Sequence, residues 1–236
     1  MTTKQADHQD HPLDNGSTVR IYRNGNHKYW TDEDNTKRSS ASTIVSYVDG
    51  NSFDVAVGWA TKLMRETNDP YAAKKSGEQS RLMGNQLHDE VDNYIKNGDI
   101  AENPAFMAWY KAVGNLQFLA AEQFVYHPTL KYGGTLDQIA LDGDKIIVQD
   151  VKSVSPESWA KYGSSLRKAK DWSQVSGYIT ALQGMGSVYK TPHAQIVYVM
   201  RDGSGVAIED VDLDMGFRLF KASMTLYELH KELNNG

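Results

Sequence analysis

The chain has 236 residues, of which 40% are hydrophobic and 23% charged, and its formal net charge is -5. These values are typical of one globular domain with a full hydrophobic core, and they exclude a fibrous or disordered chain. The absence of cysteine excludes a thiol nucleophile, a cysteine zinc site and an iron–sulfur cluster.

The N-terminal segment 1–17 is polar and rich in aspartate. It predicts a flexible tail, and it lacks the apolar stretch of a secretory signal. His8 and His11 offer nitrogen ligands for a soft metal, although a solvated terminus is the favoured interpretation. Because no apolar run elsewhere approaches the roughly eighteen residues of a membrane span, a cytosolic protein is expected.

The next part of the chain is expected to form a hairpin and then helices. Residues 18–30 alternate apolar and polar side chains around an Asn-Gly pair, which is typical of a hairpin. Serines before an apolar run predict a short capped helix within 39–48. Periodicity and a proline at a first helical position indicate more helices. They are expected at 53–65, at 77–96 and from Pro104 through Phe118.

The character of the chain changes near residue 121. Short runs of β-branched and aromatic residues, separated by glycine-containing turns, predict three strands of an antiparallel meander. A helix, two more strands and a last amphipathic helix follow. The expected ranges are strands at 122–127, 134–141 and 145–152, a helix at 172–182, strands at 194–200 and 206–211, and a helix at 213–233.

Two carboxylates, Asp137 and Asp150, fall on adjacent predicted strands joined by a tight turn. Neighbouring strands lie less than about 5 Å apart, so both carboxylates can converge on one cation. Lys152 follows two residues later on the same face of its strand. Hard oxygen ligands select Mg²⁺ or Mn²⁺, which would polarise a water while the lysine neutralises a phosphate. Taken alone, a D-x-K triplet is more often an exposed charged turn.

Three motifs occur in order on the predicted strands and helix, beginning at Gly134, Asp150 and Gln174. They resemble the G-x-x-D, D-x-K and Q-x-x-x-Y motifs of RecB-like nucleases in the PD-(D/E)XK superfamily. On an earlier predicted helix, His88 is similar to the histidine metal ligand of that branch. Without the motifs, His88 would be interpreted as a packed or surface residue.

The resemblance implies one α/β nuclease domain at 18–236, with a restriction-endonuclease-like core in which helices flank a mixed central sheet. A hairpin and helical region at 18–120 would partly roof the active site, 121–212 would hold the catalytic sheet and the Gln174 helix, and 213–236 the C-terminal helix. The serine-rich segment before the first helix is similar to small stand-alone exonucleases of phage and organelle type. The iron–sulfur subfamily is excluded by composition, and a helicase motor by the missing Walker A segment.

The resemblance also implies roles for individual residues. Lys152 would orient the attacking water and stabilise the phosphate in the transition state, with Gln174 as a positioning donor. Glu122 would be a further acid near the metal, although a surface glutamate at a strand end is an equal alternative. The implied metal ligands are His88, Asp137, Asp150, the Val151 carbonyl and Glu122. The implied catalytic residues are Lys152, Asp137, Asp150, Gln174 and Tyr178.

Two basic clusters flank these motifs. Cations with interleaved aromatic residues suit a single strand, because its phosphates attract positive charge and its bases stack on rings. A solvated loop explains the same residues equally well, and a serine at a strand end also satisfies backbone groups. The candidates for nucleic-acid binding are Lys161, Arg167, Lys168, Lys170 and Ser153, and, before the His88 helix, Lys74, Lys75 and Arg81.

The expected function is DNA hydrolysis by an exonuclease that uses one or two Mg²⁺ or Mn²⁺ ions and favours single strands or free ends. Its setting would be DNA recombination, repair, replication or phage DNA metabolism, in the cytoplasm of a bacterial or phage-infected cell or in an organelle matrix. A single-strand-binding or annealing protein is a candidate partner, and no membrane is expected. The alternatives are an endonuclease of the same fold and a DNA-binding recombination accessory with little catalysis.

Overall fold

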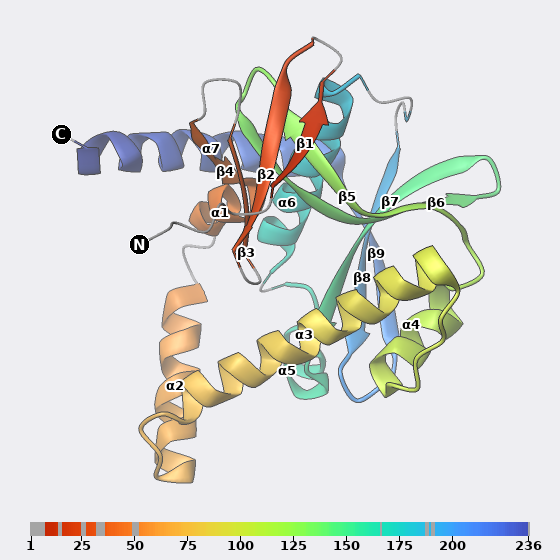
Figure 1. Cartoon of the computed structure of the whole chain (residues 1–236). Coiled ribbons are helices and arrows are strands. Elements are labelled where there is room, and N and C mark those ends of the chain that lie inside the picture. The colour runs from red at the N-terminus through yellow and green to blue at the C-terminus, as the bar shows by residue number, and fades with distance from the viewer. Residues whose placement is uncertain are drawn as a thin grey trace, which may run out of the picture.

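The computed structural model describes residues 8–13, 16–24, 27–31, 36–48, 52–165, 167–186, 189 and 192–235. Within them, nine strands form one mixed sheet that carries helices on both faces (Figure 1), which is the α/β architecture expected. No helix in this part of the chain combines the length and the apolarity that a bilayer crossing requires.

The strands are β1 His8–Pro12, β2 Thr18–Asn24, β3 His27–Thr31, β4 Lys37–Ser40, β5 Gln117–His127, β6 Tyr132–Asp142, β7 Lys145–Val154, β8 His193–Met200 and β9 Val206–Asp210. The helices are α1 Ala41–Ile44, the 3-10 helix η1 Val45–Val48, α2 Ser52–Thr67, α3 Ala72–Asn97, α4 Pro104–Val113, α5 Pro156–Tyr162, α6 Lys168–Gly184 and α7 Leu213–Asn235. The expected hairpin is confirmed as β2 and β3, although its turn residues 25 and 26 lie outside the described residues.

The sheet has a gap in its pairing at the centre. Its strand order is β1-β2-β3-β4-β6-β7-β8-β9, and β5 also pairs with β6. Parallel β4 pairs with β6 only at Tyr132 and Gly133, whereas antiparallel β7 pairs with β6 only from Gln138 onward. Residues 134–137, which form the first motif, therefore pair with β5 alone.

A side-chain hydrogen bond marks the point where β6 and β7 diverge. Gln138 and Gln149 are the last register pair of these strands. Both are buried, and Gln138 Nε2 donates to Gln149 Oε1 at 2.5 Å. The bond joins two buried amides next to Asp137 and Asp150, so it fixes the strand separation beside these carboxylates, although Gln138 Oε1 has no partner among the described residues.

Two hydrophobic cores lie on opposite faces of the sheet. Leu87 of α3 and Trp109 of α4 share one core with Val197 of β8. On the other face, Ile179 of α6 packs with Ile196 of β8 in a core that also holds α7 and α1. Successive side chains of a strand point to opposite faces, so β8 contributes to both cores. Figure 1 shows α3 crossing in front of the strands, with α2 packed at its beginning and set away from the sheet.

Apart from the start of β5, the structure differs from the expected elements in three places. Strand β1 lies within the segment that was expected to be a flexible tail. A polar segment can form this edge strand because it pairs with β2 through main-chain groups. The helix that begins at Pro104 ends at Val113, and Phe118 lies in β5. The Phe118 ring stacks on Trp109 of the helix, so the apolar spacing in the sequence continues although the helix has ended. Helix α5 replaces part of an expected loop, with Ser155 as its N-cap.

Candidate metal and phosphate site

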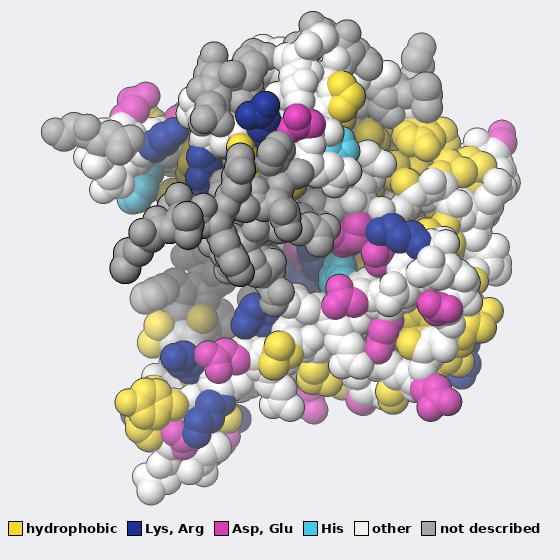
Figure 2. All heavy atoms as spheres, viewed as in Figure 1, with side chains coloured by type: hydrophobic (Ala, Val, Ile, Leu, Met, Phe, Trp, Pro, Cys, Tyr) yellow, Lys and Arg dark blue, Asp and Glu magenta, His cyan; other side chains and the backbone are white. Residues whose placement is uncertain are grey.

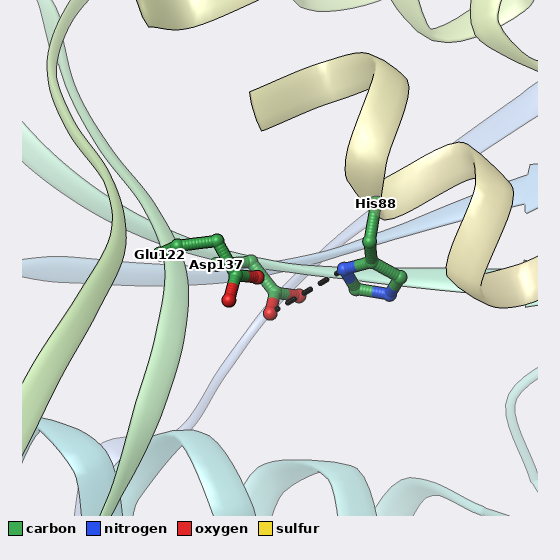
Figure 3. A group of neighbouring side chains, drawn as sticks. All are labelled: His88, Glu122 and Asp137. Carbon is green, nitrogen blue, oxygen red and sulfur yellow. Dashed lines mark ion pairs between the residues drawn. The ribbon is translucent and has the colours of Figure 1, made fainter. Parts of the chain in front are cut away.

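A histidine and two carboxylates meet beside the gap in the sheet (Figure 3). His88 comes from α3, Glu122 from β5 and Asp137 from β6, and one ligand atom of each lies within 4.8 Å of the others. His88 Nδ1 is 3.6 Å from Asp137 Oδ1. Carboxylate oxygens suit hard ions such as Mg²⁺ and Mn²⁺, and an imidazole nitrogen suits a transition-metal ion. The structure thus brings together three of the residues that the sequence proposed as ligands.

Asp137 is oriented by the backbone of the neighbouring strand. Its Oδ2 accepts a hydrogen bond from the Val151 N–H at 2.7 Å. Val151 lies beyond the last pair of β6 with β7, so this carboxylate takes the place of a ladder acceptor. Burial raises the pKa of Asp137 to about 6, with His88 acting against the rise and Asp150 adding to it.

Glu122 has an unusual backbone. Its neighbours pair as Ala121 with Gln138 and Gln123 with Leu136, so Glu122 lies opposite Asp137. Its φ of 49° is in the left-handed region, which costs a non-glycine residue on the order of 1 kcal/mol or more. Strain of this kind concentrates at functional sites. The expectation that Glu122 begins its strand was wrong, because β5 starts at Gln117.

A second chain of contacts connects the other two motifs. Asp150 Oδ2 lies 2.6 Å from Lys152 Nζ. Lys152 Nζ also donates to Gln174 Oε1 at 3.4 Å, and Gln174 Nε2 donates to Tyr178 Oη at 2.8 Å. The Asp150 carboxylate is therefore paired with the lysine, and its role as a metal ligand stays a prediction.

The electrostatics of Lys152 decide which chemistry it can perform. Burial lowers its pKa, but the carboxylates of Asp150, Asp171 and Asp137 outweigh burial, and the net shift is upward. Lys152 is therefore an ammonium at neutral pH, suited to stabilising negative charge and unsuited to removing a proton. The pKa of Tyr178 is also raised, first by burial and then by Asp150, so its phenol is neutral.

Gly134 is needed where the first and third motifs meet. A Cβ at this position would lie 2.4 Å from Cε1 of the Tyr178 ring. Real Cβ atoms do not approach an aromatic carbon so closely, so the ring occupies the space that any larger residue would fill. The glycine of β6 and the tyrosine of α6 are therefore one packing unit, and Tyr178 in turn holds Gln174.

Two further residues, Asp171 and Tyr198, belong to this site and were not predicted from the sequence. Asp171 is buried on α6, and its Oδ2 accepts a hydrogen bond from Tyr198 Oη at 3.0 Å. Tyr198 is the register partner of Lys152 on parallel β8. Asp171 precedes Gln174 by three residues, so both lie on one helix face, and that spacing was the signal available in the sequence.

Most residues of the two basic clusters have local partners. Lys168 Nζ lies 3.0 Å from Glu209 Oε1 and 4.2 Å from the centre of the Trp172 ring. Lys161 lies over its neighbour Tyr162, Lys75 pairs with Asp69 and Lys74 with Glu78. Arg81 is exposed on α3, Lys170 is half-buried on α6, and Ser153 accepts a hydrogen bond from Arg201. Their binding of nucleic acid stays a prediction.

Figure 2 shows acidic, basic and histidine side chains gathered in the middle of one face, above the middle of α3. This is the region in which α3 contacts β5 and β7, and His88, Glu122 and Asp137 come from α3, β5 and β6. Charged groups of both signs therefore mark the face on which the candidate site lies.

Neither a family model nor a curated protein matches the sequence. Among solved structures, the chain is similar to LHK-Exo in complex with dAMP, with 14% identity, a TM-score of 0.43 and coverage of 84% of this chain and 90% of that one. It is also similar to SSO0001, with 15% identity, a TM-score of 0.37 and coverage of 78% and 74%. The chemistry proposed below rests on the side chains of this chain.

Proposed function

We propose that the protein is a metal-dependent deoxyribonuclease that hydrolyses phosphodiester bonds with Mg²⁺ or Mn²⁺. The observation that carries the proposal is the convergence of His88, Glu122 and Asp137 on one point. Lys152 is close enough to influence the pKa of Asp137, so a fixed positive charge accompanies the three ligands. A cation site beside an ammonium is the arrangement that phosphate hydrolysis needs.

The donor set fits a divalent metal cation. His88 would supply a neutral nitrogen and Glu122 and Asp137 would supply oxygens, with Asp150 and the Val151 carbonyl as further proposed ligands. When bound, the ion would lower the pKa of a coordinated water and neutralise phosphate charge. The chain has no cysteine that could hold an iron–sulfur cluster. The proposed cofactor is therefore one or two such ions.

The residues of the chain divide the remaining work. The hydrogen bond from Val151 keeps the Asp137 carboxylate turned toward the ligand cluster. Asp150 holds Lys152 charged, and Gln174, itself held by Tyr178, orients the ammonium. Lys152 would then stabilise the negative charge that develops on the phosphate oxygens in the transition state.

We further propose an exonuclease that favours single strands or free ends and acts in DNA recombination, repair, replication or phage DNA metabolism. A linear and a circular single strand separate this proposal from its alternatives. The protein with Mg²⁺ should degrade the linear strand and spare the circle, and chelation should stop the reaction. Cleavage of the circle would indicate an endonuclease, and a mobility shift without cleavage would indicate a DNA-binding accessory.

Glu122→Gln tests the ligand cluster itself. Replacing one carboxylate by a neutral amide of the same size should weaken Mn²⁺ binding at least about tenfold, measured by calorimetry. Glu102→Gln is the matched control, because Glu102 is an exposed glutamate between α3 and α4. Equal Mn²⁺ affinities for parent, control and Glu122→Gln would remove Glu122 from the ligand set.

A further inference from the structure

Two half-buried arginines lie at the ends of β8 and α6, two elements that pack against each other. Arg201 directly follows β8, and Arg167 directly precedes α6. Burial and then the charge of Arg167 lower the pKa of Arg201, while Glu157 on α5 acts in the opposite direction. The two guanidinium groups therefore interact, and like charges withdrawn from water repel each other unless an anion lies with them.

Arg201 is held in a fixed orientation. Its Nε donates to Ser153 Oγ at 3.2 Å and its Nη2 to the Ser153 carbonyl oxygen at 3.4 Å. Its Nη1 donates to Ser80 Oγ on α3 at 3.0 Å. A guanidinium has five N–H donors, so within the described part of the chain these bonds leave donors for a ligand.

Arg167 has an unmet hydrogen-bonding requirement. Its Nε is buried and has no hydrogen-bond partner among the described residues. Asp171 is close enough for Arg167 to lower its pKa, but that carboxylate already accepts the hydrogen bond from Tyr198. Across the described ranges, neither arginine forms an ion pair with a carboxylate. A buried donor without a partner is uncommon, and an absent ligand is one explanation for it.

We propose that Arg167 and Arg201, with the hydroxyl groups of Ser80 and Ser153, bind a backbone phosphate of the substrate strand. The inference deepens the proposed nuclease function and rests on it. Guanidinium groups suit this ligand, because they donate parallel N–H bonds to two phosphate oxygens. Serine hydroxyls add donors without adding charge.

The position of this site relative to the ligand cluster follows from α3. Ser80 precedes His88 by eight residues of the same helix, which places it about 12 Å along the helix axis. A strand advances at least about 3.4 Å per nucleotide, so the bound phosphate would lie at most about three or four nucleotides from the scissile one. Ser153 follows Lys152 directly, so the same strand end connects the two sites.

Arg167→Gln is the first test. The Arg167 side chain forms no hydrogen bond to another described residue, so the substitution removes none. Binding of a fluorescent single strand is measured without metal across a salt series. Loss of one phosphate contact should flatten the slope of log K against log salt by about 0.7. Arg218→Gln removes an exposed arginine of α7 and should leave the slope unchanged. Equal slopes for the parent and Arg167→Gln would overturn the phosphate site.

Substrate length supplies the second test. With a twelve-nucleotide strand, kcat/KM of Arg167→Gln should fall about tenfold or more, whereas with a dinucleotide, too short to reach the arginines, it should fall much less. Arg201→Lys keeps the positive charge but cannot donate two parallel N–H bonds to a phosphate. It should show the same selective loss of kcat/KM on the longer strand. Equal losses on both substrates would overturn the proposal. A parent that cleaves neither substrate would refute the nuclease function, while the metal-free salt series would still test the anion site.

Discussion

Asp171 brings a further carboxylate into the electrostatic environment of Lys152. It is buried on α6, and burial raises its pKa to about 6, with Lys152 opposing the rise and Asp150 adding to it. The Tyr198 hydroxyl donates to it, so the charged form has one good partner. Asp171 therefore helps to keep Lys152 charged, although the sequence motifs do not include it.

The titration of Asp171 predicts how stability depends on pH. The unfolded carboxyl has a pKa near 3.8, and the folded one near 6, so the folded chain binds this proton more tightly. Its stabilising contribution is complete below the unfolded pKa and is lost as pH rises through about 6. Asp171→Asn removes this titration, so its unfolding free energy relative to the parent should increase by up to about 3 kcal/mol between pH 4 and 7.

Urea unfolding of the metal-free protein at pH 4, 5, 6 and 7 measures this difference. Asp202→Asn is a control of opposite sign, because the hydrogen bond from Ser204 lowers the pKa of Asp202. Its contribution is present above the unfolded pKa and is lost only as pH falls below it, so between pH 4 and 7 the stability of the variant relative to the parent should fall only slightly. Parallel pH profiles for Asp171→Asn and the parent would contradict the assigned pKa.

At the scale of elements, β6 and α6 form the unit that holds Lys152. Tyr178 packs over the Cα of Gly134, and its hydroxyl accepts from Gln174, which in turn contacts the ammonium. A residue with a Cβ at position 134 would displace the ring and, through it, the amide. The motif glycine thus acts on the site through packing.

Gly134→Ala should lower the unfolding free energy by about 1–3 kcal/mol, as overpacking of a close contact does. It should also lower kcat, since the displaced ring no longer holds Gln174. Gly58→Ala is the matched control, because a Cβ on that glycine of α2 meets nothing within 4 Å. In a Tyr178→Ala background Gly134→Ala should cost less than in the parent, because the ring is no longer there to clash. A Gly134→Ala protein with parental stability and kcat would disprove the contact.

The sequence allowed some elements to be predicted and concealed others. The three strands and α6 were predictable because their periodicity and turns are local properties of the chain. Helix α5 has only seven residues, and its Ser-Pro start was its one clear signal. The left-handed backbone of Glu122 left no trace in the sequence, because it arises from pairing with β6. Arg201 was missed because its partner Ser80 is distant in the chain.

At the scale of the molecule, the candidate site depends on both layers of helices. α3 carries His88 and packs on one face of the sheet, whereas α6 carries Gln174 and packs on the other. The two sets of side chains meet where residues 134–137 of β6 lack a partner from β4 or β7. The motif order predicted which residues would meet, but the gap depends on the parallel pairing of β4 with β6, which joins segments about ninety residues apart.

This arrangement predicts that the two layers unfold together. Ile196 and Val197 are adjacent and fully buried residues of β8, and each belongs to a different core. Truncating either one leaves a cavity, so Ile196→Ala and Val197→Ala should each lower the unfolding free energy by about 2–4 kcal/mol. Because β8 belongs to both cores, each variant should shift one common urea transition, seen alike by circular dichroism and tryptophan fluorescence.

Ile208→Ala is the control. Ile208 lies on β9 and is 46% exposed, so this variant should lower the unfolding free energy by less than about 1 kcal/mol. A second transition, or a shift seen by only one probe, would mean that the layers are separate folding units and that the site can lose one half while the other stays folded.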